Sequence, residues 1–257
     1  DTTCLLLYDL PVLPPVSISE SVSLSPDLLQ FIPTNVKSAI QSGHLEFLSQ
    51  NRMLTMLFIG LVSQDVLADS IQIAACIQRA VTIVASLMEQ NDGQIVNLLV
   101  DDKGTAIVCA FGLPPFGHSA VTALKCALDI SDMLSHENIG SHIGISTGTV
   151  YAGVVGTSLR RDYNIVGNAV NLAARLMKHS ESVSLPLLAD KATCDAAEHR
   201  VETGYSKDVA FTFQLLDNLV LKGQPGAIPV FIPCLRMNVV ADKLTFFGRE
   251  LELALLV

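Results

Sequence analysis

The sequence is poor in positive charge. Its 257 residues include 16 Lys and Arg against 25 Asp and Glu, which gives a formal net charge of −9. Proteins that bind nucleic acid usually present a strongly basic face, so this balance argues against a nucleic-acid partner. It does not exclude a nucleotide ligand, because a small local group of basic residues is enough to hold phosphate.

Paired cysteines are also missing. The six cysteines are scattered along the chain without a Cys-x-x-Cys pair, and several of them lie inside apolar runs. This usage predicts reduced thiols in the core of a cytoplasmic protein. The absence of an Asn-x-Ser/Thr sequon agrees with that prediction.

Long hydrophobic runs are absent as well. The apolar runs extend over about ten residues, whereas a membrane-spanning helix needs about 20. The chain begins at Asp1, without Met and without the basic-then-apolar pattern of a signal peptide. We therefore expect a fragment of a longer polypeptide that has no membrane span.

Several common catalytic motifs are lacking. The six histidines show neither HExxH spacing nor a His/Cys metal pattern. A Ser-His-Asp triad cannot be assigned from sequence order alone. The segment Gly153-Val154-Val155-Gly156 lacks the rest of a dinucleotide-binding or P-loop motif, so we interpret it as a tight strand end.

Composition divides the chain into four parts. Residues 1–26 are rich in Pro and Ser, which predicts a linker or an extended arm. Residues 27–50 predict a helical connector that packs against the rest. Residues 51–235 carry the periodic pattern of a folded domain, and residues 236–257 form a second linker.

The periodic pattern predicts an α+β fold. It indicates a strand over 53–62, a helix over 70–90, strands over 95–100 and 105–111, and a helix over 118–135. Further elements are a strand over 183–188, a short helix over 190–198, and strands over 211–221 and 228–232. The order strand, helix, strand, strand, helix, strand is ferredoxin-like, a split βαβ sheet with helices on one face.

The most informative stretch is 141–177. Alternation over His142–Ser146 and over Val150–Val155, with Thr147-Gly148 between them, predicts a β-hairpin. A polar, basic loop over 156–162 follows the hairpin and leads to a helix that begins near residue 168.

Two polar residues of that helix could meet a phosphate. Asn171 and Arg175 lie four residues apart and therefore share one face. The basic loop contributes Arg160 and Arg161 nearby, and Arg donates to phosphate oxygens in a fixed fork. From spacing alone, such a pair is more often a solvated helix face than a site. The apolar stripe of the same helix is formed by Val170, Ala173, Ala174 and Met177.

This stretch resembles a known family. The run Asn171-Leu172-Ala173-Ala174-Arg175, preceded by Tyr163-Asn164-Ile165-Val166-Gly167, resembles the signature of class III nucleotide cyclases. Gly144-Ile145 and Gly153-Val154-Val155-Gly156 precede it in the family's order. The resemblance covers about residues 27–233. It implies two pseudo-symmetric halves, of which one supplies two Asp for Mg²⁺ and the other supplies base recognition and the Asn/Arg pair.

The resemblance implies that this chain is the half without metal. The family's two metal-binding Asp positions fall on Gly60 and Thr105, and neither can offer the carboxylate that Mg²⁺ prefers. Asp101 and Asp102 lie nearby but off register, and we interpret them as a solvated turn. The Mg²⁺ or Mn²⁺ ligands are then expected from the first cyclase half of the same polypeptide, which would be the partner.

The complementary set of residues is largely present. By resemblance, Lys103 and Asn164 recognise adenine, Asn171 orients the ribose, and Arg175 binds phosphate in the transition state. Asn164 departs from the Asp or Thr usual in adenylyl cyclases, although Asn can both donate and accept hydrogen bonds. The Glu and Cys pair of guanylyl cyclases is missing. We expect an adenylyl cyclase half that converts ATP to cyclic AMP and pyrophosphate only with its partner.

Two further segments indicate which members of the family this chain resembles most. Asp102-Lys103-Gly104 and Phe58-Ile59-Gly60-Leu61 resemble the second cyclase half of bicarbonate-responsive soluble adenylyl cyclases. Residues 246–252 resemble the entry to an NTPase module. These features imply a cytoplasmic protein and bicarbonate regulation, with a bicarbonate site that lies largely in the first half.

A non-enzymatic alternative stays open. A degenerate cyclase-like half could serve only as a dimerisation and regulatory module. The loss of both metal-binding Asp and the change at Asn164 favour that alternative. The retention of Lys103, Asn171 and Arg175 favours the enzyme, because a scaffold has no physical need for the three together.

Overall fold

The computed structural model describes residues 32, 36–38, 49–62, 70–101, 104–117, 119–157, 161–202, 210–220 and 226–236. The chain divides into two units, Asp1–Pro33 and Thr34–Val257. Apart from residue 32, all described residues belong to the second unit. The arm predicted over 1–26, most of the connector over 27–50 and the linker beyond residue 236 lie outside the described residues, so these boundaries stay predictions.

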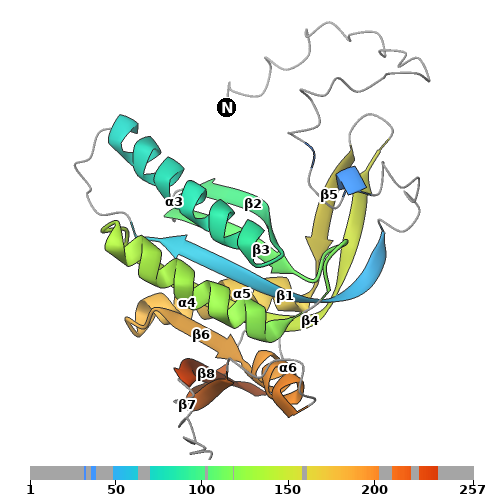
Figure 1. The fold of residues 1–257 in the computed structure, drawn as a ribbon, viewed down its shortest axis with the longest axis vertical. Coiled ribbons are helices and arrows are strands. Elements are labelled where there is room, and N and C mark those ends of the chain that lie inside the picture. The colour runs from blue at the N-terminus through green and yellow to red at the C-terminus, as the bar shows by residue number, and fades with distance from the viewer. Residues whose placement is uncertain are drawn as a thin grey trace, which may run out of the picture. The chain divides into compact units, whose positions relative to one another are not determined.

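The first elements of the domain follow the predicted order. They are β1 (Gln50–Leu61), α3 (Ser70–Gln90), β2 (Gly93–Asp101), β3 (Gly104–Phe111), α4 (Ala120–His136) and β4 (Ser141–Gly156). Their strands lie side by side as β2-β3-β1-β4, and each neighbouring pair is antiparallel. This arrangement confirms the ferredoxin-like prediction (Figure 1).

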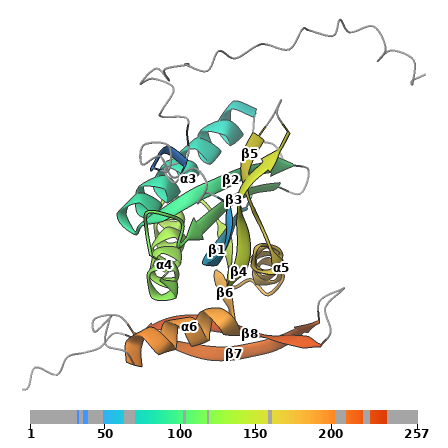
Figure 2. The same ribbon diagram turned by 90° about the vertical axis from the view of Figure 1, so that its right-hand side faces the viewer.

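The central strand β1 is covered on both faces. Its residues Leu54–Ile59 are buried without interruption, the pattern of a strand with no solvent-facing side. Leu57 and Ile59 pack in one cluster with α3 and α4, whereas Met56 and Phe58 pack in another with the helix α5 (Asn168–Ser182). Figure 2 shows α4 and α5 on opposite sides of β1 and β4. The predicted placement of the helices on one face is therefore wrong.

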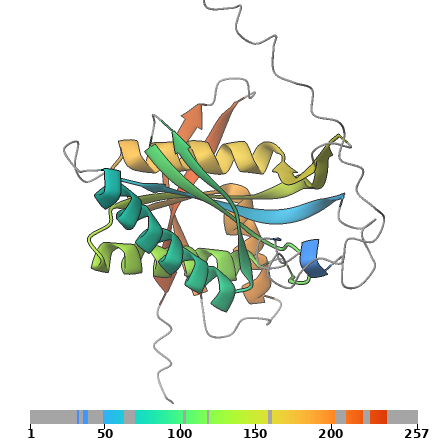
Figure 3. The ribbon, with the colours of Figure 1, turned by 90° about the horizontal axis from the view of Figure 1, so that it is seen from above.

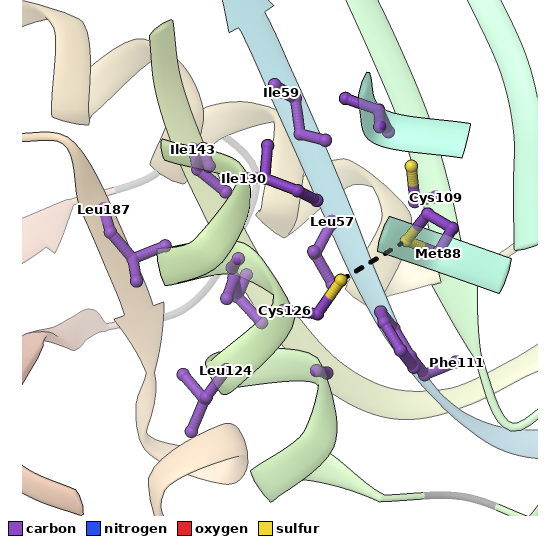
Figure 4. Close-up of a cluster of buried hydrophobic side chains, with 14 of the residues drawn as sticks. Leu57, Ile59, Met88, Cys109, Phe111, Leu124, Cys126, Ile130, Ile143 and Leu187 are labelled. Carbon is purple, nitrogen blue, oxygen red and sulfur yellow. Dashed lines mark hydrogen bonds between the residues drawn. The ribbon is translucent and has the colours of Figure 1, made fainter. Parts of the chain in front are cut away.

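The larger cluster lies between the sheet and α3 and α4. In Figure 4, Leu57 and Ile59 of β1 meet Met88 of α3 and Ile130 of α4. All four side chains are at most 1% exposed. Burying an aliphatic side chain of this kind stabilises the fold by roughly 1.5–3 kcal/mol relative to leaving it exposed, so this face carries much of the domain's stability.

Sulfur atoms are part of this cluster. The Sγ of Cys126 lies 4.0 Å from the Sδ of Met88, and Cys109 lies buried beside them (Figure 4). Burial raises the pKa of the Cys126 thiol to about 12 and the pKa of Cys109 further still. Both residues, like the other described cysteines, are free thiols, as the scattered spacing predicts.

The hairpin predicted at Thr147-Gly148 is wrong. Both residues lie inside β4, which pairs with β1 without a break from Ser141 to Ala152. The buried hydroxyl of Thr147 is hydrogen-bonded to the hydroxyls of Thr55 (2.8 Å) and Thr193 (2.9 Å). Gly148 faces α5, so the glycine marks close packing against a helix instead of a turn.

The chain does turn back, but further along. The end of β4 pairs antiparallel with β5 (Arg161–Val166), in the register Gly156 with Arg161. The segment over 156–162, predicted as a loop, therefore contains the start of a strand. Figure 1 shows β4 and β5 as a two-stranded ribbon, with α5 following directly after β5 in the chain.

The remaining elements complete an eight-stranded sheet. They are β6 (Leu187–Asp190), α6 (Lys191–Glu202), β7 (Ala210–Val220) and β8 (Ala227–Arg236). The full strand order is β2-β3-β1-β4-β6-β8-β7, with β5 paired to β4 outside this path and β6 parallel to β4. The strand predicted from residue 183 begins at Leu187, because Val183 and Ser184 form a turn in which Ser184 has a φ of 52°.

The helix α3 is long and apolar for a helix of a folded domain. By length and composition alone, Ile71–Gln90 could cross a membrane, and among the described residues no other helix meets that test. Its buried residues Ala80, Val84 and Met88 belong to the cluster against the sheet, which is the position of an ordinary domain helix. Figure 3 shows α3 lying along the same side of the sheet as α4.

Candidate active site

The site is built around α5. The helix rests on β4, β1 and β6, and its buried residues are Ala169, Leu172, Ala173, Leu176, Met177 and Ser180. The predicted apolar stripe is correct at Ala173 and Met177, whereas Val170 and Ala174 are only half-buried. Asn171, Arg175 and Lys178 are exposed on the side of the helix that faces away from the sheet. The amide and the guanidinium predicted to act together are thus brought to one solvent-facing surface.

The strand before α5 carries the third predicted residue. Asn164 lies on β5 opposite Gly153 of β4 and is exposed. Only Ile165, Val166 and Gly167 separate Asn164 from the start of α5 at Asn168. Arg161 begins β5, whereas Arg160 lies outside the described residues.

Lys103 belongs to the turn between β2 and β3, and it lies outside the described residues together with Asp102. The residues on either side of Asp102 and Lys103 are described. Asp101, Gly104 and Thr105 line a hollow of about 200 Å³ whose other wall includes Ala174 and Met177 of α5. The described ends of β2 and β3 therefore lie across this hollow from α5.

The two positions that the resemblance assigns to metal-binding Asp, Gly60 and Thr105, line the same hollow. Gly60 pairs with Ala106 of β3 and His142 of β4, while Thr105 is half-buried beside it. A β-carbon on Gly60 would overlap the Sδ of Met177, whose side chain is only 7% exposed. A carboxylate at this position has no room to project while Met177 keeps its place.

The polar groups around the hollow do not form a metal site. No group of three or more His, Cys, Asp or Glu that could hold a metal ion occurs among the residues the structure describes. Lys178 and Glu181 form an ion pair of 3.0 Å, but both side chains are more than half exposed, so the pair adds little stability. The Nδ1 of His142 lies 3.1 Å from the carbonyl oxygen of Leu185 and is engaged there. Among the residues that the structure describes, those that line the hollow do not fit Mg²⁺.

Sequence reasoning missed the part played by Met177. The helical period places Met177 on the buried stripe of α5. Only the packing of α5 on β1 brings the sulfur of Met177 against Gly60. A glycine in the middle of a strand was the available signal, because such a glycine often marks close approach of another element.

The chain matches a known family over most of its described length. A profile described as "Adenylate and Guanylate cyclase catalytic domain" matches residues 48–232. Adenylate cyclase type 10 of Homo sapiens is 30% identical over 213 residues, which are 81% of this chain and 12% of the human protein. The chain thus spans about an eighth of the length of this relative.

Solved structures share the fold. A bacterial light-regulated adenylyl cyclase has a TM-score of 0.65 at 20% identity, covering 80% of this chain and 60% of that chain. The guanylate cyclase domain from Catenaria anguillulae, in complex with GTP, has a TM-score of 0.59 at 22% identity, covering 73% of this chain and 99% of that chain. The fold is therefore common to cyclases of both kinds. Its match to the family profile, its likeness to adenylate cyclase type 10 and the placement of its signature helix agree, and the chain belongs to the class III adenylate and guanylate cyclase catalytic domains.

Proposed function

We propose that this chain is the metal-free catalytic half of a cytoplasmic adenylyl cyclase, active at an interface with a metal-bearing half of the same polypeptide. The observation that carries the proposal is the pairing of Asn171 and Arg175 on the exposed face of α5, while Met177 fills the space in front of Gly60. The chain thus keeps on α5 the two side chains that would act on the substrate, and it places Met177 where a carboxylate at position 60 would have to project.

The reaction is the cyclisation of ATP. The ribose 3′-oxygen attacks the α-phosphorus, the bond from that phosphorus to the β-phosphate oxygen breaks, and pyrophosphate leaves while the 3′-hydroxyl loses its proton. Arg175 stabilises the charge that develops on the phosphorus oxygens, and Asn171 holds the ribose in line for attack. Mg²⁺ or Mn²⁺ held by the partner half would neutralise the attacking and leaving oxygens.

Adenine is the base we infer. Lys103 and Asn164 would read its ring edge, since Asn can accept from the amino group and donate to a ring nitrogen. The likeness to adenylate cyclase type 10 supports this choice. The fold does not select the base, because a guanylate cyclase domain shares it. Bicarbonate regulation stays a prediction about the paired protein, with its site mainly in the other half.

The test is cyclic AMP formation by the paired halves. We expect Arg175→Ala to lower kcat by roughly 100-fold or more, the loss seen when one charge-stabilising group is removed from a transition state. Arg79→Ala is the matched control. This arginine is also exposed, but it lies on α3 and pairs with Glu137 across 3.9 Å, so its loss is expected to leave activity unchanged.

Two outcomes would contradict the proposal. Equal activity of Arg175→Ala and the unaltered protein would move the chemistry away from α5. No activity in correctly paired halves would favour the alternative, a cyclase-like half that only dimerises and regulates.

A further inference from the structure

The strand β4 has two glycines, Gly144 and Gly148, where it packs beneath α5. Gly144 is buried in β4 and pairs with Phe58 of β1. Residues opposite each other in an antiparallel pair point to the same face, and Phe58 belongs to the cluster that α5 covers. Gly144 and Gly148, four residues along β4, both lie beneath α5.

Gly144 lies against the backbone of the helix. A β-carbon at this position would overlap the carbonyl oxygen of Ala173 and the backbone nitrogen of Met177, and it would lie 2.8 Å from the carbonyl carbon of Leu176. Backbone atoms inside a helix cannot rotate away as a side chain can. Any side chain at position 144 therefore forces the whole helix away from the sheet.

The other close glycines differ in this respect. A β-carbon on Gly60 meets the side chain of Met177, and a β-carbon on Gly148 would lie 3.3 Å from the methyl group of Ala169. The first neighbour is flexible, and the second contact needs a shift of only a few tenths of an ångström. Among these three contacts with α5, only Gly144 fixes the distance between the helix backbone and the sheet.

We propose that Gly144 is a positioning residue, which sets the height of α5 above the sheet and through it the placement of Asn171 and Arg175. Arg175 lies on the outer side of the same helical turn that rests on Gly144. A helix lifted from the sheet carries Arg175 outward by the same amount. This inference rests on the proposed function, because it assigns Arg175 to the reaction.

The test is Gly144→Ala in the paired halves, with Gly148→Ala as the matched control on the same strand. We expect Gly144→Ala to lower kcat by about 100-fold, since a misplacement of about 1 Å costs a rate of that order. The KM for ATP should stay within about threefold, because Lys103 and Asn164, which would read the base, lie outside α5. Gly148→Ala should stay within about threefold of the unaltered protein in both constants, because its contact needs little movement.

A crystal structure of the Gly144→Ala chain gives a readout that does not need activity. We expect α5 to move away from β4 by on the order of 1 Å, because non-bonded carbon atoms settle about 3.5–4.0 Å apart. If the unaltered halves make no cyclic AMP, the proposed function fails, but this displacement still tests the role of Gly144 in seating the helix.

Several results would overturn the inference. They are an unchanged kcat in folded Gly144→Ala, a loss that comes from KM alone, an unmoved α5, or an equal loss in Gly148→Ala. Where Gly144→Ala does not fold, Ala173→Ser adds one atom to a side chain that is 0% exposed, on the turn of α5 that rests on Gly144. A lowered kcat with unchanged KM in that variant supports the inference, and an unchanged kcat overturns it.

Discussion

Gly60 and Gly144 lie in neighbouring strands, β1 and β4, and α5 covers both. Their neighbours differ, because Gly60 faces the sulfur of a side chain and Gly144 faces helix backbone. A side chain can be shortened by mutation, whereas backbone cannot. The strain from a larger residue at position 60 should therefore depend on Met177, and the strain at position 144 should not.

The first prediction is a double-mutant cycle at Gly60 and Met177. We expect Gly60→Ala to lower the free energy of unfolding by about 1–2 kcal/mol, the cost of overpacking a core. In a Met177→Ala background the same change should cost at least about 0.5 kcal/mol less, because the overlapping sulfur is gone. Urea unfolding of the four proteins measures the coupling. An equal cost in both backgrounds would mean that Met177 does not fill this space.

At the scale of elements, α6 shows how one buried carboxyl ties a helix to the sheet. Asp190 ends β6 and is 4% exposed. It accepts hydrogen bonds from the backbone nitrogen of Thr193 (2.9 Å) and from the hydroxyl of Ser146 in β4 (2.7 Å). It thus acts as the N-terminal cap of α6 and as a link to β4.

The second prediction follows from that link. Asp190→Ala should lower the free energy of unfolding by about 2–3 kcal/mol, because it leaves the Thr193 N–H and the Ser146 hydroxyl buried without an acceptor. Asp195→Ala on the same helix is the control. Its carboxylate pairs with Lys191 at the surface, so its loss should cost less than about 1 kcal/mol. Chemical denaturation compares the two variants, and equal losses would refute the cap.

The same carboxyl gives a pH dependence. Burial raises the pKa of Asp190 above its ordinary value of 3.8, although its hydrogen bonds act in the opposite direction. The folded protein then holds this proton more tightly than the unfolded chain. The stability contributed by the neutral form is present below the ordinary pKa and is lost as pH rises through the raised value.

The third prediction uses this sign. Asp190→Asn keeps an acceptor for the Thr193 N–H but cannot ionise, so its stability relative to the unaltered protein should increase as pH rises from about 4 to 7. Unfolding free energies measured across that range decide the question. A stability difference that stays constant or decreases as pH rises would show that burial does not raise the pKa of Asp190.

The elements that periodicity predicted well are those with one dominant environment. The helices α3 and α4 gave clear patterns because each packs against one cluster, and β1 gave a continuous apolar run because both of its faces are buried. The hairpin at Thr147-Gly148 was wrong because a glycine in a strand can mark either a turn or a close helix. The strand β5 was missed because it has only six residues, so the alternation of Tyr163 and Ile165 with Asp162 and Asn164 is too short to stand out.

At the scale of the whole molecule, the candidate site could be named in part from the sequence. Asn171 and Arg175 could be singled out because the run over 163–175 resembles a family signature, since their spacing alone is as typical of a solvated helix face. The sequence could not show that Met177 occupies the space beside Gly60, since this depends on contact between residues that lie far apart in the chain. The residues that the proposed partner half would supply cannot be named from this sequence.

The final prediction concerns this chain on its own. Neither Gly60 nor Thr105 offers a carboxylate, so a purified homodimer should form no cyclic AMP from ATP with Mg²⁺ or Mn²⁺. Addition of the metal-bearing half should create activity. Both are measured by cyclic AMP formation, with the metal-bearing half alone as the control. Robust activity of the isolated chain would refute the assignment of these two positions.

The buried sulfurs of the core affect how the protein can be handled chemically. A thiol reacts through its thiolate, and a pKa of about 12, as for Cys126 and Cys194, leaves roughly one molecule in 100,000 in that form at neutral pH. Among the described cysteines only Cys234, on β8, is exposed. Alkylating reagents should therefore modify Cys234 quickly in the native protein. They should reach Cys109, Cys126 and Cys194 only when the domain opens, so the rate at which these thiols are labelled reports the rate of unfolding.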